Sequence, residues 1–344
     1  MNALGASLLL CMSSTGFAEI VMNSSGNSNQ ANISWSSEEA NLLLNGDVSA
    51  NTAAYSEPSP KGSVNVTTTV RSGSSAVQAA PKTVQILDTS SYSNQPSVNA
   101  RAALVMDAQT GEVLFGKNAN TALPIASLTK LMTAVVTADA RLNMSEQITL
   151  QQIDFAGAGG KNSSSTLRVG DKMNRAEVLL FALMKSENPA AAALARTYPG
   201  GRTAFFAAMN AKARSLGMSS THYVESSGLD PRNVASARDL GILVTAASQY
   251  SLIRQFSTTP SYDFNLGYRV LKSNNTNALV RNGGWNINIS KTGYINEAGR
   301  CVVMHTTLNN RPAVVVILGA NNTQARNDDA VRLMNWASQL PKRV

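Results

Sequence analysis

The sequence contains little cysteine, histidine or charge. It has 2 cysteines and 2 histidines among 344 residues, and only 15% of the residues are Asp, Glu, Lys or Arg. No cluster of Cys and His with zinc-binding spacing can be drawn from it, and we expect neither a metal nor another cofactor. A Ser-His-Asp triad would depend on His222 or His305, and packing or surface roles explain both histidines better.

No apolar run reaches the roughly 20 residues that a membrane-spanning helix needs. Residues 1–18 carry no charge, contain an apolar run over 4–12, and end in small residues at Gly16 and Ala18. We interpret them as a secretory signal peptide cleaved near Ala18, although no Lys or Arg precedes the apolar run. Its removal leaves Cys301 without a partner for a disulfide, and we expect a buried thiol in a strand.

Residues 19–98 are rich in Ser, Asn, Thr, Gln and Pro and poor in large apolar side chains. Such a composition buries too little surface to offset chain entropy, which predicts a flexible tether. The chain carries +8 and this segment −3, from six acidic and three basic side chains, so residues 99–344 carry +11. That charge suits a carboxylate-rich or polyanionic partner. No basic run interleaved with aromatic residues indicates nucleic acid.

Hydrophobic alternation predicts strands near both ends of the folded part, with helices between them. The predicted strands are 102–107, 112–115, 287–291, 301–308 and 313–318. The predicted helices are 128–140, 174–184, 203–216, 237–248 and a closing helix over 331–340. This order indicates an α/β fold of the α+β type in one domain, 99–344. One antiparallel sheet is flanked by helices, a helical lobe is inserted, and the active site lies in the cleft between them.

One pair of side chains combines a nucleophile with a base. Ser127 and Lys130 stand three residues apart at the start of the predicted helix 128–140. Positions i and i+3 share a helix face, so the lysine amine can reach the serine Oγ. A lysine accepts a serine proton only when its pKa is lowered toward neutrality, and the apolar residues around this pair can provide the necessary burial.

Two further motifs follow in order. Ser186-Glu187-Asn188 closes the predicted helix 174–184, 59 residues after Ser127, and Lys291-Thr292-Gly293 stands at the end of strand 287–291, 105 residues later. Each motif alone would indicate only a helix end or a turn. The ordered trio Ser-x-x-Lys, Ser-x-Asn and Lys-Thr-Gly resembles the penicillin-recognising serine acyl-enzymes, and therefore implies a β-lactamase/DD-peptidase-like fold.

The surrounding residues narrow this resemblance to the low-molecular-weight penicillin-binding proteins, the D-alanyl-D-alanine peptidases of family S11. The matching segments are Met106-Asp107 with Gly111, 124–134, Gly228-Leu229-Asp230 and 236–240. Segments 184–188, 198–201, 285–287 and 291–294 resemble the endopeptidases of the penicillin-binding protein 7 type. Carboxypeptidase relatives usually have Gly where Glu187 stands, and they add a β-rich domain and an anchor where only 51 residues follow Gly293. Both departures favour an endopeptidase.

The resemblance implies a role for each motif residue. Ser127 is the nucleophile, Lys130 its base, and Ser186 a proton relay to the leaving amine. The residues expected to bind substrate are Asn188, Lys291, Thr292 and Gly293. The backbone N–H groups of Ser127 and Tyr294 are the expected oxyanion donors.

The implied function is hydrolysis of D-alanyl-diaminopimelate crosslinks in peptidoglycan, with β-lactams acylating Ser127. The implied location is the periplasm; we expect a monomer that binds no nucleic acid, and loose membrane association stays open. A D-alanyl-D-alanine carboxypeptidase is the main alternative. A β-lactamase of class A would need a Glu-x-x-Leu-Asn loop, which 225–229 does not match. A non-catalytic β-lactam-binding scaffold would have lost a motif residue, and none is missing.

Overall fold

The structure is a computed structural model that describes residues 94–157 and 165–341. The predicted signal peptide and nearly all of the predicted tether lie outside these residues. The described chain enters the fold slightly before residue 99, because Val98 is buried. The backbone N–H groups of Asn99 and Ala100 donate to Oδ2 of the buried Asp329, at 2.9 and 2.8 Å.

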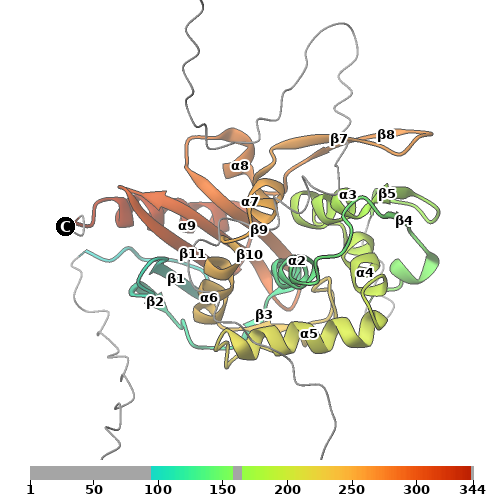
Figure 1. The fold of residues 1–344 in the computed structure, drawn as a ribbon. Coiled ribbons are helices and arrows are strands. Elements are labelled where there is room, and N and C mark those ends of the chain that lie inside the picture. Colours follow the sequence, from blue (N-terminus) through green and yellow to red (C-terminus); the bar gives the residue numbers. More distant parts are fainter. Residues whose placement is uncertain (1–93, 158–164, 342–344) are drawn as a thin grey trace, which may run out of the picture. The chain divides into compact units, whose positions relative to one another are not determined.

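A five-stranded antiparallel sheet forms the centre of the described region (Figure 1). Its strands are β1 (Ala102–Asp107), β2 (Val113–Lys117), β9 (Ile287–Ile295), β10 (Gly299–Leu308) and β11 (Arg311–Ala320). The order across the sheet is β2-β1-β11-β10-β9, so the first hairpin pairs with the last strand of the chain and β9 is an edge strand. Both predicted hairpins are confirmed.

Both faces of the sheet are buried. Along β11, Val314 and Val316 join the cluster that includes the apolar residues of α6 (Ala237–Ala247), whereas Val315 and Ile317 join the cluster with α9 (Thr323–Ser338). Successive side chains of a strand point to opposite faces, so this near-continuous apolar run is what a strand covered on both sides requires. The buried Cys301 in β10 agrees with the predicted strand thiol.

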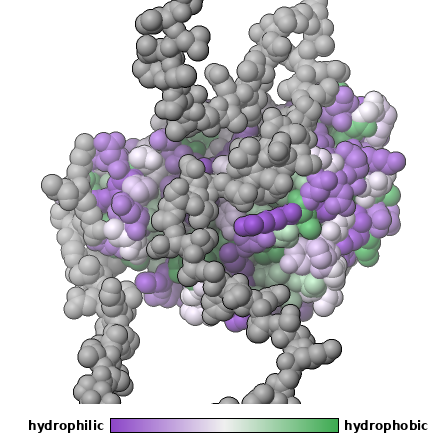
Figure 2. Space-filling view, viewed as in Figure 1, coloured by the Kyte–Doolittle hydropathy of each residue, from purple (hydrophilic) through white to green (hydrophobic). Residues whose placement is uncertain are grey.

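The remaining helices, 3₁₀ turns and short strands build the lobe and the connections. The helical segments are η2 (Ala126–Leu128), α2 (Thr129–Asp139), η3 (Gln152–Asp154), α3 (Arg175–Leu180), η5 (Phe181–Lys185), α4 (Asn188–Arg196), α5 (Gly201–Ser215), α7 (Ser251–Thr258) and α8 (Ala278–Asn282). The short strands are β3 (Leu123–Pro124), β4 (Gln147–Thr149), β5 (Lys172–Asn174), β6 (Val234–Ala235), β7 (Ser261–Asn265) and β8 (Val270–Asn274). Figure 1 shows α2 between the sheet and the lobe helices α3, α4 and α5. Figure 2 shows hydrophilic residues over much of the visible described surface.

The junction after α3 departs from the single predicted helix 174–184. The predicted cap at its start is confirmed, since Asn174 Oδ1 accepts from Glu177 N and Glu177 Oε2 accepts from Asn174 N. The helix then widens into the π-helical turn η5 and ends at Ser186, whose φ of 65° is left-handed. A new helix, α4, starts two residues later at Asn188. The Ser-x-Asn motif therefore lies in the joint between two helices.

Candidate active site

Ser127 lies in the 3₁₀ turn η2 immediately before α2, and two glycines allow the surrounding backbone to approach it. Gly228, at φ +85°, lies so close that an added Cβ would be 1.8 Å from Ala126 O. On the other side, an added Cβ on Gly293 in β9 would be 3.0 Å from Ser127 N. At Gly228 only glycine fits, and at Gly293 a side chain would force the backbone of the serine turn to shift. The serine turn is held between a loop and the edge strand.

Lys130 is completely buried and its amine has three oxygen neighbours. Its Nζ lies 2.9 Å from Ser127 Oγ, 2.6 Å from Asn188 Oδ1 and 2.6 Å from the carbonyl oxygen of Ser227. A neutral amine has two N–H donors and one lone pair. If the two carbonyl oxygens accept both N–H bonds, the lone pair faces the hydroxyl of Ser127, which is the arrangement that a base needs.

The surroundings of Lys130 set its proton affinity near neutrality. Burial lowers the pKa of Lys130 from the ordinary value of 10.5 to about 7, and the charges of Glu225 and Glu187 oppose that shift. Removal from water disfavours the ammonium, whereas a nearby carboxylate stabilises it. An amine with this pKa is neutral in about half of the molecules at pH 7, so it can accept a proton from Ser127.

A second buried lysine stands across the site. Lys291 Nζ donates to Ser186 Oγ at 2.8 Å and to the carbonyl oxygen of Thr292 at 2.9 Å. Burial, followed by the charges of Lys130 and Arg326, lowers the pKa of Lys291 well below its ordinary value. The sequence predicts Lys291 as a source of positive charge. In the structure, that charge is disfavoured until an anion approaches and raises the lysine pKa again.

The Lys-Thr-Gly motif lies inside β9 and not at its end. The strand continues through Tyr294 to Ile295 because Ile295 pairs with Gly299 of β10. Thr292 Oγ1 donates to Thr276 Oγ1 at 2.7 Å, and the half-exposed Tyr294 ring lies under the guanidinium of Arg300, 3.7 Å from Cζ to the ring centroid. Since β9 is the edge strand, one side of its backbone is available to an extended ligand.

Glu187, between the two polar residues of its motif, ties the helix joint to the segment that precedes β5. Its carboxylate accepts from Ser165 Oγ at 2.6 Å and from Thr166 Oγ1 at 2.6 Å. Glu187 is only 5% exposed, and its charge acts on Lys130. A glycine at this position could make neither contact, so Glu187 fixes a part of the site border that a Gly-containing motif would leave to other residues.

Several cationic side chains act on one another near Lys291 of β9. Arg326, in the first turn of α9, is 4% exposed. Burial, together with the charges of Arg300 and Arg281, lowers its pKa to about 10, while Cys301 opposes the shift. Like charges in a poorly solvated place repel one another, and an anionic group would relieve that repulsion. This end of the site is chemically suited to a carboxylate.

A cavity of about 290 Å³ borders the site on the lobe side. Asn188 and Ser227, whose oxygens contact Lys130 Nζ, line it, and so do Phe155, Phe206 and Glu225. The sequence predicts a cleft between sheet and lobe. The described cavity lies between α4, the start of α5 and the loop after Tyr223, and neither Ser127 nor Lys291 lines it. The cleft between sheet and lobe stays a prediction.

The described residues contain neither a metal-binding cluster nor a helix that could span a membrane. Residues 94–157 and 165–341 contain no group of three or more His, Cys, Asp or Glu placed to hold a metal ion. Within those same ranges, every helix is too short or too polar to cross a bilayer.

A family model described as D-alanyl-D-alanine carboxypeptidase, that of peptidase S11, matches residues 89–322. The chain belongs to the peptidase S11 family. This S11 chain is 45% identical over 249 residues to a D-alanyl-D-alanine endopeptidase of Pseudomonas aeruginosa, covering 70% of this chain and 78% of the relative. It is 42% identical over 264 residues to a D-alanyl-D-alanine endopeptidase of Escherichia coli, covering 76% and 84%.

Solved structures agree with this assignment. The S11 chain superposes on the crystal structure of the Streptomyces K15 DD-transpeptidase with a TM-score of 0.66 at 30% identity, covering 72% of this chain and 99% of that one. The predicted α+β fold and the predicted family are thereby confirmed.

The structure brings every predicted motif residue of the S11 chain to one place. Their side chains form two hydrogen-bonded groups. Lys130 contacts Ser127 and Asn188 in one group, and Lys291 contacts Ser186 in the other. The sequence does not point to Asn233, Arg326 or the carbonyl of Ser227. A backbone carbonyl has no side-chain signature, and Arg326 is 33 residues from the end of the nearest motif, at Gly293.

Proposed function

We propose that this S11 protein is a serine D,D-endopeptidase that hydrolyses D-alanyl-diaminopimelate crosslinks of peptidoglycan through an acyl-enzyme on Ser127. The observation that carries the proposal is the 2.9 Å contact between Ser127 Oγ and an amine whose pKa is lowered to about 7. A nucleophile beside a base of matched pKa is the arrangement that acyl transfer requires.

Acylation starts with transfer of the Ser127 hydroxyl proton to Nζ of Lys130. The Oγ forms a bond to the D-alanyl carbonyl carbon, and the carbonyl electron pair moves onto its oxygen. Collapse of that tetrahedral intermediate breaks the C–N bond and leaves an ester on Ser127. The new ammonium of Lys130 is held by the oxygens of Asn188 and Ser227, 2.6 Å away in each case.

The leaving amine needs a proton, and the proton that Lys130 took from Ser127 would reach it through the hydroxyl of Ser186. Its Oγ accepts from Lys291 Nζ at 2.8 Å, so its own O–H can donate to a group in the site. Water then gives a proton to Lys130 while its oxygen bonds to the ester carbon. The C–Oγ bond breaks, and Lys130 returns the proton to Oγ, which regenerates Ser127 and releases the carboxyl product. The net result is hydrolysis of one peptide bond.

The oxyanion would be stabilised by the backbone N–H groups of Ser127 and Tyr294. The close approach of Gly293 to Ser127 N supports this pairing, because Tyr294 is the next residue along the same edge strand. Donors held in place before reaction are worth about two to three orders of magnitude in rate each.

Recognition would divide between an amide end and an anionic end. Asn188 combines a donor and an acceptor and can bind the substrate amide, while Thr292 and the Gly293 backbone border the edge strand. Lys291 and Arg326 would attract a carboxylate of the substrate or of a β-lactam. Carboxylate binding would restore the charge of Lys291, whose pKa is lowered in the ligand-free site.

Two reactions fit the same chemistry, and the relatives favour the first. The two endopeptidases at 45% and 42% identity support crosslink cleavage, whereas the description of the family model supports a carboxypeptidase. Purified protein should convert crosslinked muropeptide dimers into monomers, followed by chromatography with mass detection. Release of terminal D-alanine from pentapeptides, with intact dimers, would establish a carboxypeptidase.

We also propose that the protein acts as a monomer in the periplasm, after export by the predicted signal peptide 1–18. Cell fractionation and N-terminal sequencing of the mature protein would test export. The expected mature N-terminus is Glu19.

A further inference from the structure

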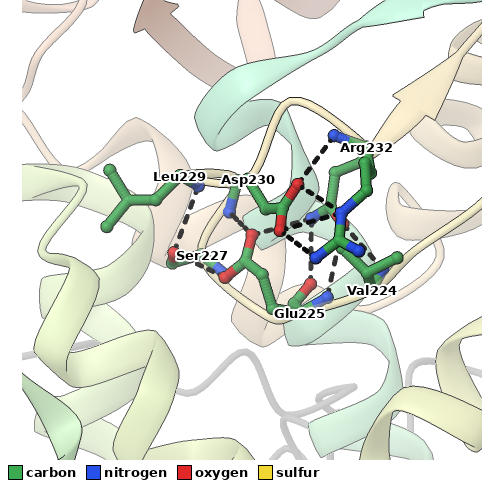
Figure 3. A network of polar contacts seen from close by, with 8 residues as sticks. Val224, Glu225, Ser227, Leu229, Asp230 and Arg232 are labelled. Atoms are coloured by element: carbon green, nitrogen blue, oxygen red, sulfur yellow. Dashed lines mark hydrogen bonds and ion pairs between the residues drawn. The ribbon is translucent and has the colours of Figure 1, made fainter. Parts of the chain in front are cut away.

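Figure 3 shows the Glu225 carboxylate turned toward its own loop, beside Ser227. The carbonyl oxygen of Ser227 in this loop contacts Lys130 Nζ. Glu225 Oε2 accepts from Ser227 N and from Ser227 Oγ, both at 2.6 Å. Its Oε1 accepts from Gly228 N and, at 2.9 Å, from Asn233 Nδ2. Four donors on one carboxylate leave the segment from Ser227 to Gly228 little freedom to rotate.

This arrangement fixes one particular peptide group. The carbonyl of Ser227 and the N–H of Gly228 belong to the same planar trans peptide and point in opposite directions. The N–H end donates to Glu225, so the C=O end must point the other way, where it meets Lys130 Nζ at 2.6 Å. The Glu225 carboxylate and the Lys130 amine thus contact opposite ends of one rigid unit.

The rest of the loop supports the same orientation. Asn233 Nδ2 also donates to the carbonyl oxygen of Glu225 at 2.9 Å and to Thr129 Oγ1 at 3.1 Å, which ties the loop to the start of α2. Thr133 Oγ1 donates to Ser226 O at 2.7 Å, one helical turn after Lys130. The loop and the helix that carries the lysine are therefore joined on both sides of the contact.

We propose that Glu225 is a positioning residue for the base: it holds the Ser227–Gly228 peptide so that the Ser227 carbonyl takes one N–H of neutral Lys130 and turns the lone pair toward Ser127 Oγ. This inference rests on the proposed function, in which Lys130 takes the proton of Ser127. Glu225 also lines the cavity beside the site. The role proposed here is exerted on Lys130 through the Ser227–Gly228 peptide and through the charge of the Glu225 carboxylate.

The charge of Glu225 adds an effect that a purely structural role would lack. The ionisable groups whose charges act on Lys130 or respond to it are Glu225 from the loop, Glu187 from the helix joint and Lys291 from β9. Glu225 is the larger of the two carboxylate effects that raise the pKa of Lys130 against burial. Without it, the lysine should lose its proton at lower pH.

The test is the pH profile of acylation by benzylpenicillin, measured on the full chain by intact-protein mass from pH 5 to 9. The wild-type second-order rate should rise with pH through a midpoint near 7, where Lys130 becomes neutral. Glu225→Gln replaces one acceptor oxygen by an NH₂ group that opposes the loop N–H groups. Its plateau should fall about 10- to 100-fold and its midpoint should move down by roughly one pH unit.

Two variants separate positioning from loss of structure. Glu225→Asp keeps the charge but shortens the side chain, so the plateau should fall while the midpoint stays near the wild-type value. Asp328→Asn removes an exposed carboxylate on α9, whose Oδ1 accepts from Gln324 Nε2 at 2.7 Å, far from the loop in sequence. It should leave both plateau and midpoint within error of wild type.

The outcomes are distinct. Wild type without added mass on Ser127 would overturn the proposed function and this inference with it. An acylated wild type with an unchanged plateau and midpoint in E225Q would overturn the inference alone. So would a midpoint in E225Q that matches E225D. Should E225Q fail to fold by circular dichroism, a wild-type plateau in folded E225D would still contradict the positioning role.

Discussion

The two sides of Ser127 each hold a buried lysine, but in opposite electrostatic surroundings. Lys130 and Lys291 are 0% and 1% exposed. The charges that act on Lys130 are carboxylates, Glu225 and Glu187, whereas those that act on Lys291 are the cations Lys130 and Arg326. Burial lowers the pKa of both. The carboxylates limit the shift on one side, and the cations add to it on the other.

The difference separates two tasks. An amine with a pKa of about 7 can take and return a proton during turnover, which suits Lys130 for acid–base work. An amine among cations has its pKa lowered further than burial alone would lower it, and an approaching anion raises that pKa again. Lys291 is thus suited to respond to the arrival of a carboxylate.

Loss of Lys130 should have the largest effect. Lys130→Met removes the proton acceptor but keeps a side chain of similar length at this fully buried position. The acylation rate with benzylpenicillin should fall by about 10²- to 10⁴-fold, the usual contribution of a general base. Intact-protein mass against time measures it. A rate within a few-fold of wild type would mean that another group takes the proton of Ser127.

Substitution of the two glycines that border Ser127 tests how tightly the backbone is packed on each side of the serine. Gly228→Ala would place a Cβ 1.8 Å from Ala126 O at a positive φ, so the free energy of unfolding should drop by about 2 to 4 kcal/mol. Gly293→Ala would place its Cβ 3.0 Å from Ser127 N and should cost about 1 kcal/mol. Urea denaturation of both variants provides the measurement. Equal losses of unfolding free energy in the two variants would contradict the tighter packing at Gly228.

Loss of Lys291 should weaken binding more than chemistry. Lys291→Met removes the hydrogen bond to Ser186 and the cation that a ligand carboxylate would create. The second-order acylation rate should fall about 10- to 100-fold, mostly through a higher dissociation constant of the first complex. Saturation kinetics separate the dissociation constant of the first complex from the rate constant of acylation. If the fall lay wholly in the acylation step, Lys291 would belong to the proton-transfer machinery.

The last prediction concerns the pH dependence of stability. Lys130 binds a proton in the unfolded chain below pH 10.5 but in the folded chain only below about 7. The unfolded state therefore binds more protons between these values, and stability should rise with pH by up to about 1.4 kcal/mol per unit per lysine. In Lys130→Met, denaturation midpoints from pH 7 to 10 should rise less steeply. An unchanged slope would contradict the lowered pKa.

Local sequence signals predicted much of the frame. The hairpins of β1–β2 and β10–β11 carry apolar alternation, and the capping box at Asn174 marks the start of α3. The helix α4 was not predicted, because Pro189 interrupts the pattern after Ser186. In the structure that proline stands in the first turn, where a missing N–H costs little, and an alanine-rich helix follows.

The motif residues could be predicted because their side chains carry nucleophilic, basic and amide groups and their spacing is distinctive. Their support could not. Glu225 lies 95 residues from Lys130 in the chain and acts through a backbone carbonyl. The segment that starts at Glu225 does not match the Glu-x-x-Leu-Asn pattern of class A β-lactamases. No local sequence pattern shows that the Glu225 carboxylate accepts from the amides of its own loop. Such a role depends on tertiary contact with α2, which periodicity does not contain.

The two hydrogen bonds from Asn99 and Ala100 to Asp329 set a practical limit on where the protein can be shortened. Asp329 is fully buried, and deleting the chain through Ala100 would strip its Oδ2 of both amide donors. A shortened version for crystallisation should therefore retain the residues from Asn94 onward, and an affinity tag belongs upstream of that point.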